Sequence, residues 1–172
     1  MTTIAQLNSS DRGEFVRTLG HLFEHSPWVA EQTWDKRPFA DSKQLHQELC
    51  ATMHRAPVAQ QRALIEAHPD LAGRLALAGK LTAESTFEQA SAGLDRMSTE
   101  ESAAFQELNT TYRARFGFPF IICARLNARD AILQAMRARI SHSPEQEHGA
   151  ALAEIEKIAW LRLQDVLQPS SR

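Results

Sequence analysis

Apolar side chains recur every three or four residues along most of this sequence and seldom alternate with polar ones. Leu45, Leu49 and Met53 form one such series. This period matches the 3.6 residues of a helical turn, so each series lies on one face of a helix and points to a core. The chain also has only 7 glycines among its 172 residues, so few positions favour a break in a helix. These two features predict an all-α protein.

Capping residues divide the chain into about eight predicted helices. At the N-terminus of each helix the first amides have no hydrogen-bond acceptor within the helix, and a polar side chain or a proline is found at these positions. The predicted starts are Asp11 with Glu14, Ser26 with Pro27, Asp41 or Ser42, Pro57, Thr82 or Ser85, Ser98 with Glu101, Asn127, and Ser143 with Gln146. Pro69 ends the fourth helix near His68, and Gly117 suits the left-handed residue after the sixth. Asp70–Leu81 is predicted as a loop or a short helix.

No segment of the chain has the composition of a linker, and no internal repeat is present. A chain of 172 residues buries enough apolar surface for one core without disulfides or metals. We therefore predict a single domain over residues 1–172, built as an irregular bundle of about eight helices. Only Phe118–Ala124 has the character of a strand, and it is too short to form a sheet alone.

The composition argues against several classes of partner and location. The chain is 43% hydrophobic and has a net charge of −2, so no basic surface is expected for nucleic acid or an anionic membrane. No apolar run approaches the roughly 18 residues of a membrane helix. Cys50 and Cys123 form no CxxC pair, which fits a reducing compartment. Met1–Leu7 does not resemble a signal peptide, and Pro169–Arg172 is not a peroxisomal signal, so we expect a cytoplasmic protein.

His68-Pro69-Asp70-Leu71-Ala72 is the first candidate for chemistry. Proline after histidine fixes the direction in which the chain leaves a helix, and the negative end of the helix favours the imidazolium form. A histidine titrates near neutral pH, so His68 can donate or accept a proton during a reaction. The pentapeptide alone leaves open that His68 only caps the helix.

Ser85-Thr86-Phe87-Glu88-Gln89 is the second candidate. Ser85 and Glu88 have the spacing of a capping box, and spacing alone favours this structural interpretation. A helix N-terminus also offers free amides to an anionic or carbonyl-rich ligand, whose polar edges Glu88 and Gln89 can bind. The two interpretations do not exclude each other.

Phe116–Ala124 is the third candidate. The simplest interpretation of this apolar run is a buried connector. A buried extended segment also carries main-chain N–H and C=O groups without helical partners, and a ligand rich in donors and acceptors can satisfy them. Cys123 is a poor candidate for a nucleophile, because no histidine is close in sequence and its surroundings are apolar.

The fourth candidate is Arg162, which falls within the apolar face of the last predicted helix. Such an arginine must reach solvent, pair with a buried acid or point into a polar pocket. A structural ion pair and the capture of a substrate carboxylate by the planar guanidinium both stay open. His21 and His25, with Glu24 between them, have the spacing of two zinc ligands, but no third ligand follows, so we predict no metal site.

These segments, in this order, resemble the OHCU decarboxylase family, named after 2-oxo-4-hydroxy-4-carboxy-5-ureidoimidazoline. The resemblance is densest over Ala67–Arg125 and returns in Glu154–Leu163, whereas about the first 50 residues match loosely. It implies an all-helical homodimer that uses no metal or organic cofactor. It also implies decarboxylation of this small molecule to (S)-allantoin in urate degradation. Without a peroxisomal signal, the chain is more similar to bacterial, cytoplasmic members than to many eukaryotic ones.

Carried over position by position, the resemblance implies roles for individual residues. His68 would be the catalytic proton donor, and Glu88 would take part in catalysis. The implied substrate-binding residues are Pro69, Ser85, Thr86, Phe87, Glu88, Gln89, Phe120, Ile121, Ile122, Cys123, Ala124 and Arg162. We therefore expect His68, Glu88 and Arg162 to converge on one polar cavity.

Three other functions stay open at this point. His68-Pro69-Asp70 matches the tripeptide of J-domain co-chaperones, although Val58–Ala67 lacks the lysine- and arginine-rich helix that precedes it there. A helical scaffold without chemistry would have a dry core in place of buried polar groups. The same fold could also act on, or hydrolyse, a related ureide.

Overall fold

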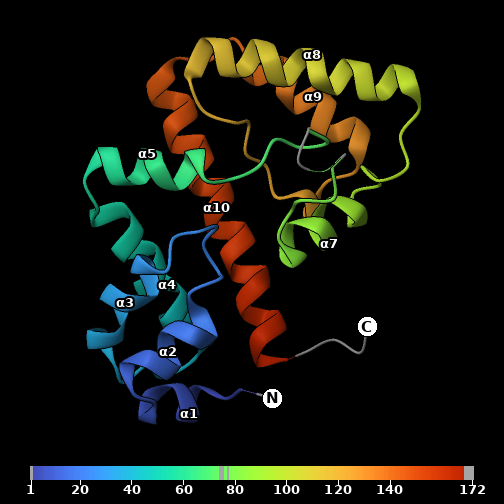
Figure 1. The fold of residues 1–172 in the computed structure, drawn as a ribbon. Coiled ribbons are helices and arrows are strands. Elements are labelled where there is room, and N and C mark those ends of the chain that lie inside the picture. Colours follow the sequence, from blue (N-terminus) through green and yellow to red (C-terminus); the bar gives the residue numbers. More distant parts are fainter. Residues whose placement is uncertain (1, 74–75, 77, 169–172) are drawn as a thin grey trace. The chain divides into compact units, whose positions relative to one another are not determined.

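The fold is all-α, as the apolar period predicts. The computed structural model describes residues 2–73, 76 and 78–168 (Figure 1). The α-helices in this part of the chain are α1 (Ile4–Ser9), α2 (Arg12–Leu19), α3 (Trp28–Thr33), α4 (Ser42–Arg55), α5 (Val58–Glu66), α7 (Ala83–Ser91), α8 (Thr99–Phe116), α9 (Arg129–Arg139) and α10 (Pro144–Leu167). The same residues include the 3₁₀ helices η1 (Trp34–Lys36) and η2 (Ala124–Leu126) and no strand. None of the described helices combines the length and the apolar character needed to cross a membrane.

The predicted loop or short helix at Asp70–Leu81 is described only in part. Residues 74, 75 and 77 lie outside the described residues, as do residue 1 and the C-terminal residues 169–172.

Contacts within the chain divide it into two compact units. Unit 1 comprises Met1–Ala67 and Glu156–Arg172, and unit 2 comprises His68–Ile155. Helix α10 contributes residues to both, because the boundary falls between Ile155 and Glu156. This division neither confirms nor contradicts the predicted single domain over residues 1–172.

In unit 1, helix α3 packs against α2 and α4. Asp41 caps α4 by accepting a hydrogen bond from the Gln44 amide at 2.8 Å, which confirms one of the two predicted starts of this helix. Leu45, Leu49 and Met53 are then fully buried along one face of α4. The helical period of the sequence thus corresponds to a real apolar face.

Two features of unit 1 differ from the prediction. Helix α1, which a capping box between Thr3 and Gln6 opens, has no counterpart among the predicted helices. Ser26 was predicted to cap α3, but the N-cap is Pro27, and the Ser26 hydroxyl donates to the main-chain oxygen of Glu24 at 3.0 Å. The hydroxyl serves the preceding turn, so α3 begins without a side-chain cap.

In unit 2, helix α8 packs against α9, and Figure 1 shows the two side by side. Capping boxes open α8 between Ser98 and Glu101 and α10 between Ser143 and Gln146, both as predicted. Gly117 ends α8 with a φ of +74°, the left-handed conformation that glycine adopts without strain.

The start of α9 differs from the prediction. Asn127 was expected to cap this helix, but the N-cap is Ala128, which makes no side-chain cap. The Asn127 Nδ2 instead donates to the main-chain oxygen of Cys123 at 2.9 Å. The asparagine therefore closes the turn around η2 rather than the first turn of α9.

The apolar core of unit 2 is built around Tyr112. The centroid of its ring lies 4.6 Å from that of Phe116, 6.1 Å from that of Phe118 and 5.3 Å from that of Phe120. The Tyr112–Phe120 pair is edge to face, an arrangement that aromatic quadrupoles favour. This packing fixes the start of the segment that continues from Phe120 to Ala124.

Candidate active site

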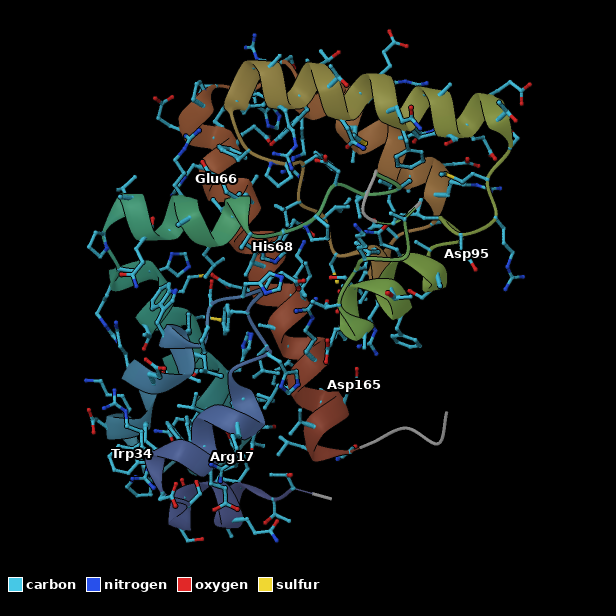
Figure 2. The ribbon with its side chains drawn as sticks, in the orientation of Figure 1. Arg17, Trp34, Glu66, His68, Asp95 and Asp165 are labelled. Carbon is cyan, nitrogen blue, oxygen red and sulfur yellow. The ribbon has the colours of Figure 1, made fainter. Side chains whose placement is uncertain are left out.

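His68 lies in the turn that follows α5. Helix α5 ends at Glu66 with Ala67 as its C-cap, as Pro69 predicts. Figure 2 labels Glu66 and His68 at this turn. The His68 side chain is buried, with 6% of the residue exposed. Burial restricts the orientations of an imidazole, which suits a group that must transfer a proton in one direction.

Gln89 of α7 fixes the chain just after His68. Its Oε1 accepts a hydrogen bond from the Ala72 amide at 2.9 Å, and its Nε2 donates to the Asp70 main-chain oxygen at 3.4 Å. Ala72 has a φ of +51°, a left-handed conformation that costs a residue other than glycine about 1–3 kcal/mol. Gln89 therefore stabilises the strained loop, and its predicted contact with substrate stays a prediction.

Two residues of α8 hold the same loop from a second direction. Asn109 Nδ2 donates to the Leu71 main-chain oxygen at 2.8 Å. Arg113 Nε donates to Asp70 Oδ1, also at 2.8 Å, in a partly exposed ion pair. The His68–Gly73 loop is thus anchored by three side chains from two helices.

Gly73→Ala is expected to destabilise this loop. A Cβ atom at Gly73 would lie 2.6 Å from the Asp70 Cβ and 3.2 Å from the Asp70 main-chain oxygen. Overpacking of this kind typically costs about 1–3 kcal/mol. Gly149→Ala is the matched control, because its Cβ meets no atom within 4 Å and alanine favours a helix by about 1 kcal/mol. In urea unfolding, the free energy of unfolding should be lower than that of the wild type for Gly73→Ala and higher for Gly149→Ala. Equal free energies of unfolding for the two variants would contradict the expected clash.

The second candidate segment lies within α7 and not at its start. The N-cap is Thr82, whose side chain accepts from the Ser85 amide at 3.2 Å, which confirms one of the two predicted starts of this helix. The predicted capping box between Ser85 and Glu88 is therefore wrong. Ser85, Glu88 and Gln89 are instead buried along one face of the helix. Ser85–Gln89 therefore does not offer the free amides of a helix N-terminus to a ligand. What the segment can contribute to a binding site is its buried side chains.

The two remaining residues of the segment lie on the other side of α7. Thr86 is exposed, and its hydroxyl donates to the Thr82 main-chain oxygen at 2.9 Å. Phe87 is 37% exposed, and the Arg125 guanidinium lies 5.3 Å from the centre of its ring. The five predicted residues are therefore divided between a buried face and an exposed one, and the substrate contacts implied for Thr86 and Phe87 stay predictions.

The third segment, Phe120–Ala124, is buried over its whole length. The Ile121 carbonyl accepts a hydrogen bond from Arg139 Nη1 at 2.8 Å, and the Cys123 amide donates to Glu154 Oε2 at 2.8 Å. Among the described residues, no group forms a hydrogen bond with the N–H or C=O of Ile122. Buried main-chain groups are nearly always paired in proteins, so Ile122 offers a donor and an acceptor to a polar ligand.

The Cys123 thiol is buried within this segment. Burial raises the pKa of Cys123, and the negative charges of Glu154 and Glu88 raise it further. A thiol with a raised pKa is a poor nucleophile, in agreement with the sequence. Of the two carboxylates, that of Glu154 from α10 contacts the segment directly, because its Oε2 accepts the hydrogen bond from the Cys123 amide.

A buried polar network that the sequence did not predict lies next to the segment. Glu147 is fully buried, with Arg139 Nη2 at 2.9 Å and His142 Nδ1 at 2.8 Å, and it accepts a hydrogen bond from the Tyr112 hydroxyl. Burial by itself would raise the pKa of Glu147, but these hydrogen bonds and the charge of Arg139 outweigh it and hold the pKa below its usual range. The Arg139 guanidinium also lies 4.3 Å from the centre of the Phe120 ring.

Arg162 belongs to unit 1, where it pairs with a buried acid. Its Nη1 lies 3.0 Å from Glu24 Oε2 and 3.3 Å from the His21 main-chain oxygen. The side chains of Arg162 and Glu24 are 3% and 2% exposed. The structural ion pair is thus the alternative that is formed, and the substrate contact implied for Arg162 stays a prediction. So does the convergence of His68, Glu88 and Arg162 on one cavity.

Comparison with known proteins gives one consistent result. A family model described as OHCU decarboxylase matches residues 8–164. The 2-oxo-4-hydroxy-4-carboxy-5-ureidoimidazoline decarboxylase of Amia calva is 44% identical and covers 95% of this chain and 93% of its own. A protein of the same name from Halalkalicoccus jeotgali is 43% identical over 97% of this chain and 93% of its own. The crystal structure of an (S)-allantoin synthase matches with a TM-score of 0.79 and 30% identity, over 98% of this chain and 54% of that one.

Proposed function

The chain belongs to the OHCU decarboxylase family of carboxy-lyases, and we propose that it converts 2-oxo-4-hydroxy-4-carboxy-5-ureidoimidazoline (OHCU) to (S)-allantoin and carbon dioxide. The observation that carries this proposal is the family match over residues 8–164, with 44% identity to a relative of that name. Buried polar groups add chemical support, because His68, Ser85 and Glu88 are each at most 8% exposed. A scaffold without chemistry would have little reason to bury these groups.

The reaction needs a place for an electron pair and a source for one proton. The bond to the carboxylate breaks, carbon dioxide leaves, and the electron pair spreads from the ring carbon into the imine and carbonyl groups of the ring. Main-chain N–H groups within Phe120–Ala124, the Ile122 N–H among them, stabilise the negative charge that results, whereas the substrate contact implied for Arg162 stays a separate prediction. Preorganised donors of this kind contribute about 3–4 kcal/mol each. His68 then delivers a proton to one face of the ring carbon that bears the ureido group, which yields a single enantiomer. The ring hydroxyl becomes the carbonyl of allantoin, and its proton supplies the one that the ring nitrogen needs after it takes up the electron pair.

The other predicted residues bind and orient the substrate in this scheme. Glu88 orients His68 or holds the ureido group, and Pro69 lines the pocket. Ser85 and Gln89 supply polar contacts from α7, and Ile122 supplies a main-chain donor and acceptor. No metal or organic cofactor is required, since the ring itself takes up the charge.

Circular dichroism of freshly generated OHCU tests the proposal directly. With the protein present, optically active allantoin should appear faster than in buffer alone, and its sign should be that of the S enantiomer. Treatment with a chelator should leave the rate unchanged. If the protein does not accelerate the appearance of optically active allantoin, the proposed activity is wrong. Turnover of a related ureide with no turnover of OHCU would support a different substrate for the same fold.

We also propose that the protein works as a homodimer in the cytoplasm of a bacterium, which the family resemblance implies. Sedimentation equilibrium of the purified chain measures the oligomeric state. A mass of one chain at the concentrations used for the activity assay would contradict the dimer and leave the proposed reaction unaffected.

A further inference from the structure

We propose that Glu154 and the Arg139–Glu147 pair are positioning residues, which hold the main chain around Ile122 in the orientation that the reaction uses. The proposal rests on the function proposed above. It assigns a role to three residues that the sequence did not single out, and it names the groups on which they act.

Two peptide groups flank Ile122. The first contains the Ile121 C=O and the Ile122 N–H, and the second contains the Ile122 C=O and the Cys123 N–H. Both are trans, because the cis peptide of the described chain lies elsewhere, before Pro38. A trans peptide is planar, and its C=O and N–H point in opposite directions. A side chain that binds one end of such a group therefore also sets the direction of the other end.

Each flanking peptide group is bound at the end that faces away from Ile122. Arg139 Nη1 donates to the Ile121 C=O at 2.8 Å and so sets the direction of the Ile122 N–H. Glu154 Oε2 accepts from the Cys123 N–H at 2.8 Å and so sets the direction of the Ile122 C=O. The donor and the acceptor of Ile122, which no described residue binds, are thus each oriented by one charged side chain.

Helix α10 supplies the rigid support for both contacts. Glu147 and Glu154 are seven residues, about two turns, apart on this helix and therefore lie on the same face. Glu154 reaches the segment directly, whereas Glu147 acts through Arg139, which it contacts at 2.9 Å while fully buried. Charge-assisted hydrogen bonds are short and directional, so the two anchors restrict the segment more than neutral contacts would.

An adjacent donor and acceptor suit a particular class of ligand. Cyclic ureides and their ureido side chains present an N–H beside a C=O, which is the complement of the Ile122 pair. A displacement of about 1 Å in such a contact can cost about 10²-fold in rate even when the substituted residue is remote from the reacting atoms. The anchors should therefore affect turnover without touching the substrate.

Glu154→Ala is the test, with Glu154→Gln as the conservative variant. The alanine variant loses the acceptor for the Cys123 amide, so kcat/KM for OHCU should fall by about 10²-fold and the enantiomeric excess of allantoin should decrease. The glutamine variant keeps an acceptor oxygen, so it should retain most of the wild-type kcat/KM and most of the wild-type enantiomeric excess. Glu145→Ala is the control on the same helix. Glu145 is exposed, so its replacement should leave both kcat/KM and the enantiomeric excess unchanged.

Hydrogen exchange gives a readout that is independent of activity. The Cys123 amide should exchange faster with solvent in Glu154→Ala than in the wild type or in Glu154→Gln. Faster exchange with unchanged kcat/KM and enantiomeric excess would overturn the positioning role, and so would unchanged exchange. If Glu154→Ala does not fold, Arg139→Lys provides the second variant, since lysine keeps the charge beside Glu147 but lacks the fork that also reaches Ile121. A wild-type protein that leaves OHCU unchanged would instead count against the proposed function.

Discussion

Replacing His68 with alanine is expected to lower kcat/KM for freshly generated OHCU by about 10²–10⁴-fold, the usual contribution of a general acid or base. The substitution removes the proton donor, while the loop stays anchored by Gln89 and Asn109 through main-chain groups of its neighbours. The circular-dichroism signal of the helices should therefore remain that of the wild type. Steady-state assays with OHCU at several concentrations measure the loss.

His54→Ala is the matched control for this prediction. His54 is 49% exposed in its side chain and pairs with Glu156 within unit 1. Removing an exposed pair of this kind costs little stability, and no role in the reaction is assigned to it. Turnover should stay at the wild-type level. Near-normal turnover by the His68 variant would show that the proton comes from another group.

Glu24→Gln is expected to lower the free energy of unfolding by about 3–5 kcal/mol, because it leaves the Arg162 guanidinium buried beside a neutral side chain. Both side chains of this pair are at most 3% exposed. Urea unfolding measures the change. Glu66→Gln provides the comparison, since Glu66 pairs with Arg62 at the surface, where each side chain is about half exposed, and such a pair contributes only about 0.3–0.5 kcal/mol. Similar losses from the two substitutions would contradict the effect of burial.

The double variant Glu24→Leu with Arg162→Met separates the two roles considered for Arg162. Replacing both members of a buried pair with apolar residues is often neutral for stability. Recovery of stability without decarboxylation of OHCU would support a contact between Arg162 and the substrate. Recovery of both would mean that the substrate contact implied for Arg162 is wrong and that the arginine serves only the fold.

Most helices could be predicted because their signals are local. Asp11, Asp41, Ser98 and Ser143 cap helices at the expected positions, and each bonds to an amide three residues away. Ser26 and Asn127 carry equally suitable side chains, yet they bond to main-chain oxygens of neighbouring turns. The sequence cannot distinguish these outcomes, because the same hydroxyl or amide has several partners within reach and the surrounding loop decides between them.

Ser85 and Glu88 illustrate a different error. Their spacing matches a capping box, but Thr82 stands one turn earlier and caps the helix first. Both Ser85 and Glu88 are buried and face the interior, which their spacing in the sequence could not show. Here the helical period was the better guide, because Ser85, Glu88 and Gln89 recur at three and four residues like the apolar positions of other helices.

The candidate site could be predicted only where its residues lie in one stretch of sequence. His68, Glu88 and Phe120–Ala124 stand in contiguous motifs, and each proves to be buried. Their roles in the reaction stay predictions. Glu154 and Arg139 could not be found in this way, because they contact the segment from 31 and 18 residues away. An acidic residue on a long amphipathic helix has the same local sequence pattern whether its side chain binds a distant amide or is solvated.

The order in which the chain is made has a consequence for the Glu24–Arg162 pair. These two residues are 138 positions apart, and unit 1 needs Glu156–Leu167 in addition to its N-terminal helices. On the ribosome residues 1–67 emerge first, but the contiguous residues 68–155 follow and can fold while unit 1 still lacks its C-terminal part. Until Arg162 emerges, Glu24 has no guanidinium to neutralise it and must stay hydrated. Translation that stops short of residue 162 therefore leaves the N-terminal helices unable to close around their acid, so proteases can recognise and remove the unfinished chain.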